Sequence, residues 1–167
     1  SYERLKDSVE TARVEYASKI HKVFSDIQNQ LLGVPIATII VATQMKDAKL
    51  IGSYEFFVNT AVLIGCWVFS ILTILIFRNQ LHTLKVLEDE IDRQQQQMHR
   101  EFSLIANSFS DAFVFLRTRA RAQRIVLWTI GVIVIAGLAL SHLVYFWLTP
   151  GVWTWLKEHL EIGRAHV

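Results

Sequence analysis

The sequence predicts an all-α integral membrane protein, and two uncharged runs carry this prediction. Residues 125–156 contain no Asp, Glu, Lys or Arg over 32 positions, and residues 56–77 add 22 more. A helix of 22 residues is about 33 Å long, close to the roughly 30 Å hydrocarbon core of a bilayer. The composition agrees, because 52% of the 167 residues are hydrophobic, which is rare in a soluble domain. We therefore predict spanning helices at 56–77 and 125–148.

The first 30 residues have the pattern of an amphipathic helix. Apolar side chains recur every three or four positions, at Leu5, Val9, Ala12, Tyr16, Ile20, Phe24 and Ile27, and charged side chains occupy the opposite face. We interpret residues 1–30 as a cytosolic helix packed against a neighbour. A helix lying in the lipid interface is the alternative.

Residues 31–46 form a shorter apolar segment that contains Pro35. The segment is shorter than most spanning helices and Pro35 lacks a backbone donor, so a kinked third span and a re-entrant segment both stay open. Basic residues accumulate on the cytoplasmic side of membrane proteins. Three spans place thirteen Lys and Arg on one side and three on the other, whereas two spans place eight on each. The charge distribution therefore favours three spans.

Residues 78–124 are polar and lie between the two long apolar runs. Apolar residues recur every seven positions at Leu84, Ile91, Met98 and Ile105, with Leu87 and Gln94 at the offset position. Residues 107–111 read as a turn or helix restart, with Ser110 or Asp111 as the helix cap. The pattern predicts a cytosolic, coiled-coil-like helical hairpin.

Basic residues at the foot of this hairpin orient the chain. Arg117, Arg119, Arg121 and Arg124 precede the last span, and they fix topology or also contact anionic lipid headgroups. We predict a multi-pass protein of a prokaryotic inner (plasma) membrane with the long loop in the cytoplasm. The architecture resembles that of bacterial membrane proteins with cytosolic coiled hairpins, a likeness that implies no activity.

An aromatic cluster marks the other end of the last span. It consists of Tyr145, Trp147, Trp153 and Trp155, and a Thr149-Pro150-Gly151 stop lies in its middle. Such residues gather at membrane surfaces, so we predict an interfacial aromatic tail at 149–161. An aromatic binding platform is the sharper alternative.

The sequence at each end of the chain suggests that it is not the natural terminus. Residues 162–167, Ile-Gly-Arg-Ala-His-Val, match the translation of a common sequencing adapter, and the chain begins at Ser1 within a helical pattern. We exclude this segment from the fold prediction and expect natural sequence before Ser1 and after Glu161.

Few polar residues lie within the predicted spans. Asn59, Thr60, Ser70, Thr73 and His142 are the candidates for polar contacts in the membrane. His142 suits either a pH sensor or an interhelical hydrogen bond. Small residues four positions apart predict close helix packing, at Gly33 and Ala37, Ala61 and Gly65, and Gly137 and Ser141.

The sequence contains no recognisable catalytic, metal-binding or cofactor-binding motif. The single cysteine, Cys66, lies within an apolar run, and a net charge of +2 does not indicate nucleic acid binding. We predict a non-enzymatic membrane module that anchors, or transmits a signal to, helical partners or further copies of itself. An oligomeric pore or transport subunit, and the membrane part of a truncated enzyme, are the alternatives.

Overall fold

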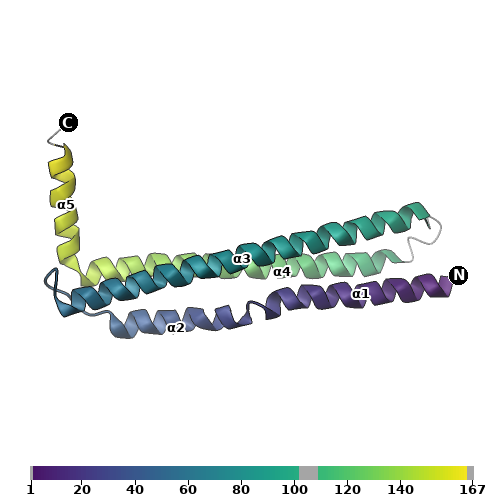
Figure 1. The fold of residues 1–167 in the computed structure, drawn as a ribbon, viewed down its shortest axis with the longest axis horizontal. Coiled ribbons are helices and arrows are strands. Elements are labelled where there is room, and N and C mark those ends of the chain that lie inside the picture. Colours follow the sequence, from purple (N-terminus) through teal and green to yellow (C-terminus); the bar gives the residue numbers. More distant parts are fainter. Residues whose placement is uncertain (1, 102–108, 165–167) are drawn as a thin grey trace. The chain divides into compact units, whose positions relative to one another are not determined.

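The computed structural model describes residues 2–101 and 109–164, and this part of the chain consists of helices and short connections, without strands (Figure 1). Its helices are α1 (Tyr2–Ser25), α2 (Gln28–Gln44), α3 (Tyr54–Glu101), α4 (Ser110–Leu148) and α5 (Pro150–Arg164). The all-α prediction is confirmed. Both α3 and α4 are long and apolar enough to cross a membrane.

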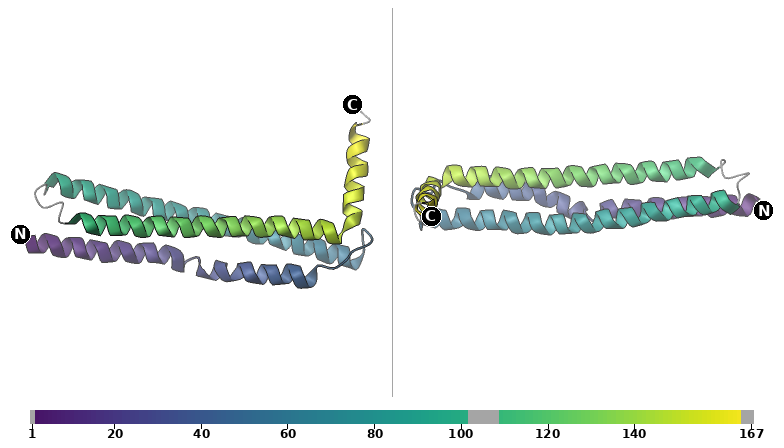
Figure 2. Two further views of the ribbon diagram at one scale, coloured as in Figure 1. Left: turned by 180° about the vertical axis from the view of Figure 1, so that it is seen from behind. Right: turned by 90° about the horizontal axis from the view of Figure 1, so that it is seen from above.

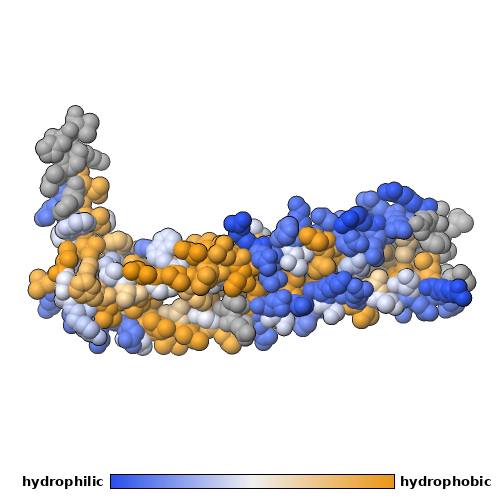
Figure 3. All heavy atoms as spheres, viewed as in Figure 1, coloured by the Kyte–Doolittle hydropathy of each residue, from blue (hydrophilic) through white to orange (hydrophobic). Residues whose placement is uncertain are grey.

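The chain divides into two units that share helices α3 and α4. Unit 1 comprises Ser1–Asn29 and Leu75–Gly131, and unit 2 comprises Gln30–Ile74 and Val132–Val167. In a space-filling view, hydrophilic residues gather over unit 1 and hydrophobic residues over unit 2 (Figure 3). The division into units therefore follows the division of the sequence into polar and apolar segments.

In unit 1, α1 lies beside the later part of α3 and the first part of α4 (Figure 2). The predicted apolar stripe of α1 faces inward, since Val9, Tyr16 and Ile20 are buried, and Ile27 in the turn after α1 is buried as well. Burial of one stripe, with charged residues left in solvent, is what stabilises a helix of this kind.

The heptad positions of α3 belong to the same core. Leu84 and Ile91 are fully buried, and α4 contributes buried Phe113 and Leu116. The apolar heptad positions of α3 are therefore covered by other helices of the same chain. Ile105, Asn107 and Ser108, which the heptad and turn predictions include, lie outside the described residues; α4 begins at Ser110.

In unit 2, α2 is a single helix of 17 residues with Pro35 inside it. A helix of this length rises about 25 Å, somewhat less than the hydrocarbon core. Whether the segment 31–46 crosses a membrane stays a prediction.

The connection from α2 to α3 is held to the end of α4. The backbone N–H of Ala48 donates to the carbonyl of Leu148 at 2.8 Å, and Met45 and Ala48 are buried. Gly52 has a φ of 88°, a conformation that glycine adopts at low cost and that turns the chain into α3. The α2–α3 connection and the end of α4 are thus tied together.

Helix α5 is the element that the sequence did not reveal. Pro150 and Gly151 suggest a stop, but Pro150 is the first residue of a 15-residue helix, and Val152 N–H donates to Thr149 carbonyl at 3.1 Å. Proline suits this position because its missing N–H would have no partner there. α5 turns sharply away from α4 (Figures 1 and 2). Its last three residues belong to the adapter-like segment.

Candidate functional site

The most connected polar residue of the apolar unit is Asn59, near the start of α3. Its side-chain oxygen accepts from Lys46 N–H at 2.9 Å, and its nitrogen donates to Lys46 carbonyl at 2.7 Å and to Thr149 Oγ1 at 3.2 Å. Asn59 and Thr149 are 0% and 1% exposed. One side chain therefore joins the α2–α3 connection, α3 and the corner between α4 and α5.

A second polar contact lies one residue further along α3. Thr60 Oγ1 donates to Phe56 carbonyl at 2.8 Å and lies 3.1 Å from the hydroxyl of Tyr145 on α4. Tyr145 is buried, unlike the other aromatic residues of the predicted belt. It therefore contributes to interhelical hydrogen bonding as well as to the aromatic cluster.

The tryptophans of the predicted belt are exposed. Trp147 is 80% exposed, and Trp153 and Trp155 are about half exposed. Trp153 also packs edge to face on Phe146 of α4, with ring centroids 6.1 Å apart, and Lys157 Nζ lies 5.5 Å from the Trp153 ring centroid. Exposed rings on two helices that meet at a corner fit an interfacial anchor.

His142 has an interhelical partner. Its Nε2 lies 3.1 Å from the indole nitrogen of Trp67 on α3. Ser141 instead bonds within α4, where its hydroxyl donates to Gly137 carbonyl at 2.8 Å. Ser70 and Thr73 are buried in α3.

The predicted small-residue positions fall in different environments. A Cβ atom added to Gly33 would lie 2.6 Å from the ring of Phe69, so α2 and α3 approach closely there. The same atom on Gly65 or Gly137 would meet nothing within 4 Å. Gly33, Ala37, Ala61 and Gly65 nevertheless line one shared cavity of about 550 Å³ between α2 and α3. Of the three glycines among these predicted positions, Gly33 is the one in tight contact with a neighbouring helix.

Two of the four arginines in α4 form ion pairs with α3. Arg117 bonds Asp92 at 2.6 Å, and Arg124 bonds Glu88. The guanidinium of Arg119 lies 5.1 Å from the ring centroid of Phe115, and Arg121 is exposed. Exposed ion pairs of this kind contribute about 1 kcal/mol or less. Arg119 and Arg121 therefore remain the candidates for contact with lipid headgroups.

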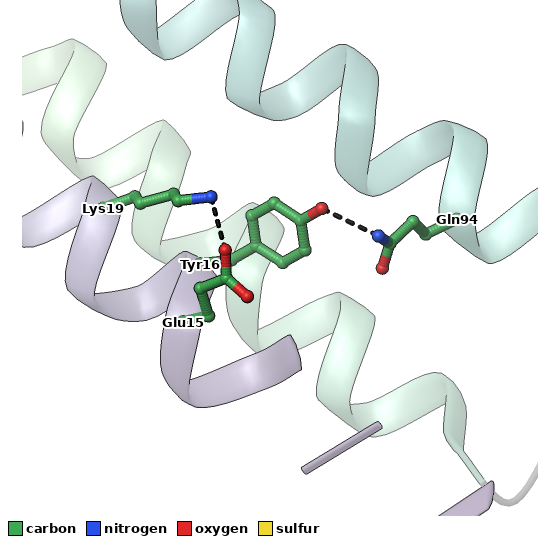
Figure 4. A network of polar contacts seen from close by, with 4 residues as sticks. All are labelled: Glu15, Tyr16, Lys19 and Gln94. Carbon is green, nitrogen blue, oxygen red and sulfur yellow. Dashed lines mark hydrogen bonds and ion pairs between the residues drawn. The ribbon is translucent and has the colours of Figure 1, made fainter. Parts of the chain in front are cut away.

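A small polar network links α1 to α3 in unit 1 (Figure 4). Gln94 Nε2 donates to the Tyr16 hydroxyl at 2.8 Å, and Lys19 pairs with Glu15 at 2.5 Å. Burial, and after it the negative charge of Glu90, raises the pKa of Tyr16 above its ordinary 10.0. The hydrogen bond to Glu15 raises the pKa of exposed Lys19. Gln94, a polar residue at a heptad position, thus forms a hydrogen bond between α3 and α1.

The described residues show no group of three or more His, Cys, Asp or Glu side chains able to hold a metal ion. The polar contacts above join helices and loops, and none of them combines a nucleophile with a base. The arrangement is suited to holding helices in register.

The sequence predicts Asn59 as a polar residue within a span, but it does not predict the groups that Asn59 binds. Lys46 and Thr149 lie 13 and 90 positions away in the chain, and no local pattern connects them. Thr149, Trp67 and Tyr16 were not recognised as polar partners. Comparison of the chain with protein-family models, curated proteins and solved structures finds no match.

Proposed function

We propose that the chain is a non-enzymatic integral membrane module, with unit 2 in the bilayer of a bacterial inner membrane and unit 1 in the cytoplasm. One observation carries this proposal. The apolar windows of α3 and α4 are only 22% buried, so most of their side chains are at least partly exposed. Apolar surface of this extent is unfavourable in water and favourable in lipid, and a soluble protein would bury such helices.

The interior of unit 2 supports the same proposal. Asn59, Thr60 and His142 find partners inside the unit, while Ile64, Val68 and Val132 are about half exposed or more. Polar groups within hydrocarbon must be satisfied internally, because lipid offers no hydrogen bonds. This distribution suits a lipid environment.

Unit 1 supplies the part that would meet a partner. Its charged residues lie at the surface, and Val14, Val86 and Val114 are exposed apolar side chains on three helices. Because α3 and α4 contribute to both units, a partner that shifts these helices in one unit acts on the same helices in the other. Anchoring and signal transmission to helical partners or further copies are therefore the functions we propose.

Cysteine labelling in a Cys66→Ala chain tests the topology. Gln96→Cys and Glu10→Cys, both at exposed positions, should react with an impermeant reagent only after the cells are opened. Lys49→Cys should react in intact cells if α2 spans the bilayer. Labelling of Gln96→Cys in intact cells would overturn the proposed orientation.

A pore or transport subunit is the alternative, in which several copies would line a path with Asn59, Thr60, Ser70, Thr73 and Ser141. All of these except Thr60 are buried within the chain, which does not favour this function. They do not present an outward polar face that several copies could share. Ion flux in liposomes decides between the two functions, because an anchor should leave the flux at the level of empty liposomes.

A further inference from the structure

Unit 2 contains a cavity that no function above uses. It has a volume of about 170 Å³ and lies between α2, α3 and α4. Its walls are Val34 to Ala42 on α2, Cys66 to Ser70 on α3 and Ile133 to Val144 on α4. Nearly all of the lining is apolar.

The hydroxyl side chains of Thr38, Ser141 and Ser70 are the exceptions in this lining, and Thr38 donates to Val34 carbonyl at 3.0 Å. Ser70 differs from the other two. The residue is 3% exposed, yet within the described part of the chain its hydroxyl forms no hydrogen bond. Ser141, on the opposite wall and 4% exposed, satisfies its hydroxyl on Gly137 carbonyl. Since Ser70 lines the cavity and its hydroxyl makes no hydrogen bond within the described residues, a ligand that supplies one gains binding free energy there.

Gly137 keeps part of the cavity open. It lines the wall formed by α4, and a Cβ atom placed on it would meet nothing within 4 Å. The space at this position is therefore not needed for helix packing. A larger side chain there has room to enter it.

We propose that this cavity binds a slender alkyl molecule carrying a single hydroxyl group, which hydrogen-bonds to Ser70. An apolar cavity of about 150 Å³ accommodates a molecule of the size of benzene, so the volume suffices for a short chain. The lining on α2 runs from Val34 to Ala42, a rise of about 12 Å, which suits an extended chain better than a compact ring.

The test follows the reactivity of a thiol placed in the cavity. The full-length Cys66→Ala, Val134→Cys chain is purified into nanodiscs, because Val134 lines this cavity and Cys66 lines the neighbouring one as well. Modification by methyl methanethiosulfonate is timed by mass spectrometry at increasing mole fractions of 1-hexanol or of hexane. We expect 1-hexanol to slow the reaction until the effect saturates.

Matched variants test two features separately: the hydrogen bond to Ser70 and the open volume of the cavity. Ser70→Ala should raise the half-maximal mole fraction of 1-hexanol about fivefold, as for one lost hydrogen bond, and leave that of hexane unchanged. Thr73→Val removes another buried hydroxyl of α3 and should alter neither. Gly137→Val should slow the reaction without any probe and abolish protection, whereas Gly65→Val, on the neighbouring cavity, should not.

Protection that rises without saturation, or that is the same in all variants, would refute the site. An equal response of Ser70→Ala and Thr73→Val would refute the role of Ser70. These measurements require neither the cytoplasmic placement of unit 1 nor a partner, so their failure would leave the proposed anchoring function standing.

Discussion

Trp67 on α3 donates its indole N–H to Nε2 of His142 on α4 across 3.1 Å, with the two rings edge to face and their centroids 5.6 Å apart. Because an indole nitrogen only donates, Nε2 acts as acceptor and the ring proton lies on Nδ1, 2.8 Å from Leu138 carbonyl. Both ring nitrogens of neutral His142 are therefore satisfied. This geometry matches an interhelical hydrogen-bonding role for His142.

The first prediction concerns this pair. Trp67→Phe and His142→Ala should each lower the free energy of unfolding in detergent, and the double variant should lose less than their sum. We expect a coupling of about 1 kcal/mol, the net value of one hydrogen bond. Trp128→Phe, at an exposed position, is the control. Strict additivity would mean that the two side chains do not interact.

The second prediction concerns Asn59, whose side-chain amide bonds both Lys46 in the α2–α3 connection and Thr149 between α4 and α5. Asn59→Ala removes its hydrogen bonds to Lys46 and Thr149 and should lower the unfolding free energy by about 2 to 3 kcal/mol. Hydrogen exchange should also quicken at the amide of Ala48. Asn79→Ala, at an exposed position of the same helix, should cost less than about 0.5 kcal/mol. Equal effects of the two changes would contradict the clamping role.

The third prediction concerns pH and Tyr16. Its folded-state pKa is raised by burial, so the protonated form is favoured on folding. The stabilisation is present below the unfolded-state value near pH 10 and is lost as the pH rises through the folded-state pKa. Ultraviolet absorbance titration, compared between the parent chain and Tyr16→Phe, should show that the ionisation lost with Tyr16 lies above pH 10.

Tyr16→Phe provides the matching stability measurement. It removes the hydroxyl bonded to Gln94 and should reduce the loss of stability above pH 10, whereas Tyr54→Phe should not. The same alkaline dependence in Tyr16→Phe and the parent chain would show that other groups cause it.

The fourth prediction separates packing within the chain from packing between copies. Gly33→Leu should destabilise the isolated chain, because Phe69 already lies against that position. Gly65→Leu has open space around it, so it should leave the stability of a monomer in detergent nearly unchanged. Any loss of crosslinking in membranes with Gly65→Leu would then report contact with another copy. Unchanged crosslinking would place Gly65 against lipid.

The sequence alone determined the helices and the separation of polar from apolar segments. Residues 56–77 and 125–148 lie within α3 and α4, and the stripe on residues 1–30 is buried in α1. These features are local, because hydrophobic length and a repeat of three to four residues reflect the geometry of one helix. Helix α5 was missed since Pro150 and Gly151 read as a stop, although a proline preceded by threonine also marks a helix start.

Only the tertiary structure decided which side chains meet. The contacts of Asn59 with Thr149, Trp67 with His142 and Gln94 with Tyr16 join residues 75 to 90 positions apart. The unpartnered hydroxyl of Ser70 and the cavity beside it arise in the same way, from three helices brought together. A helical pattern shows which face is apolar, but the rotation and axial position of each helix against its neighbours depend on the packing of the whole unit.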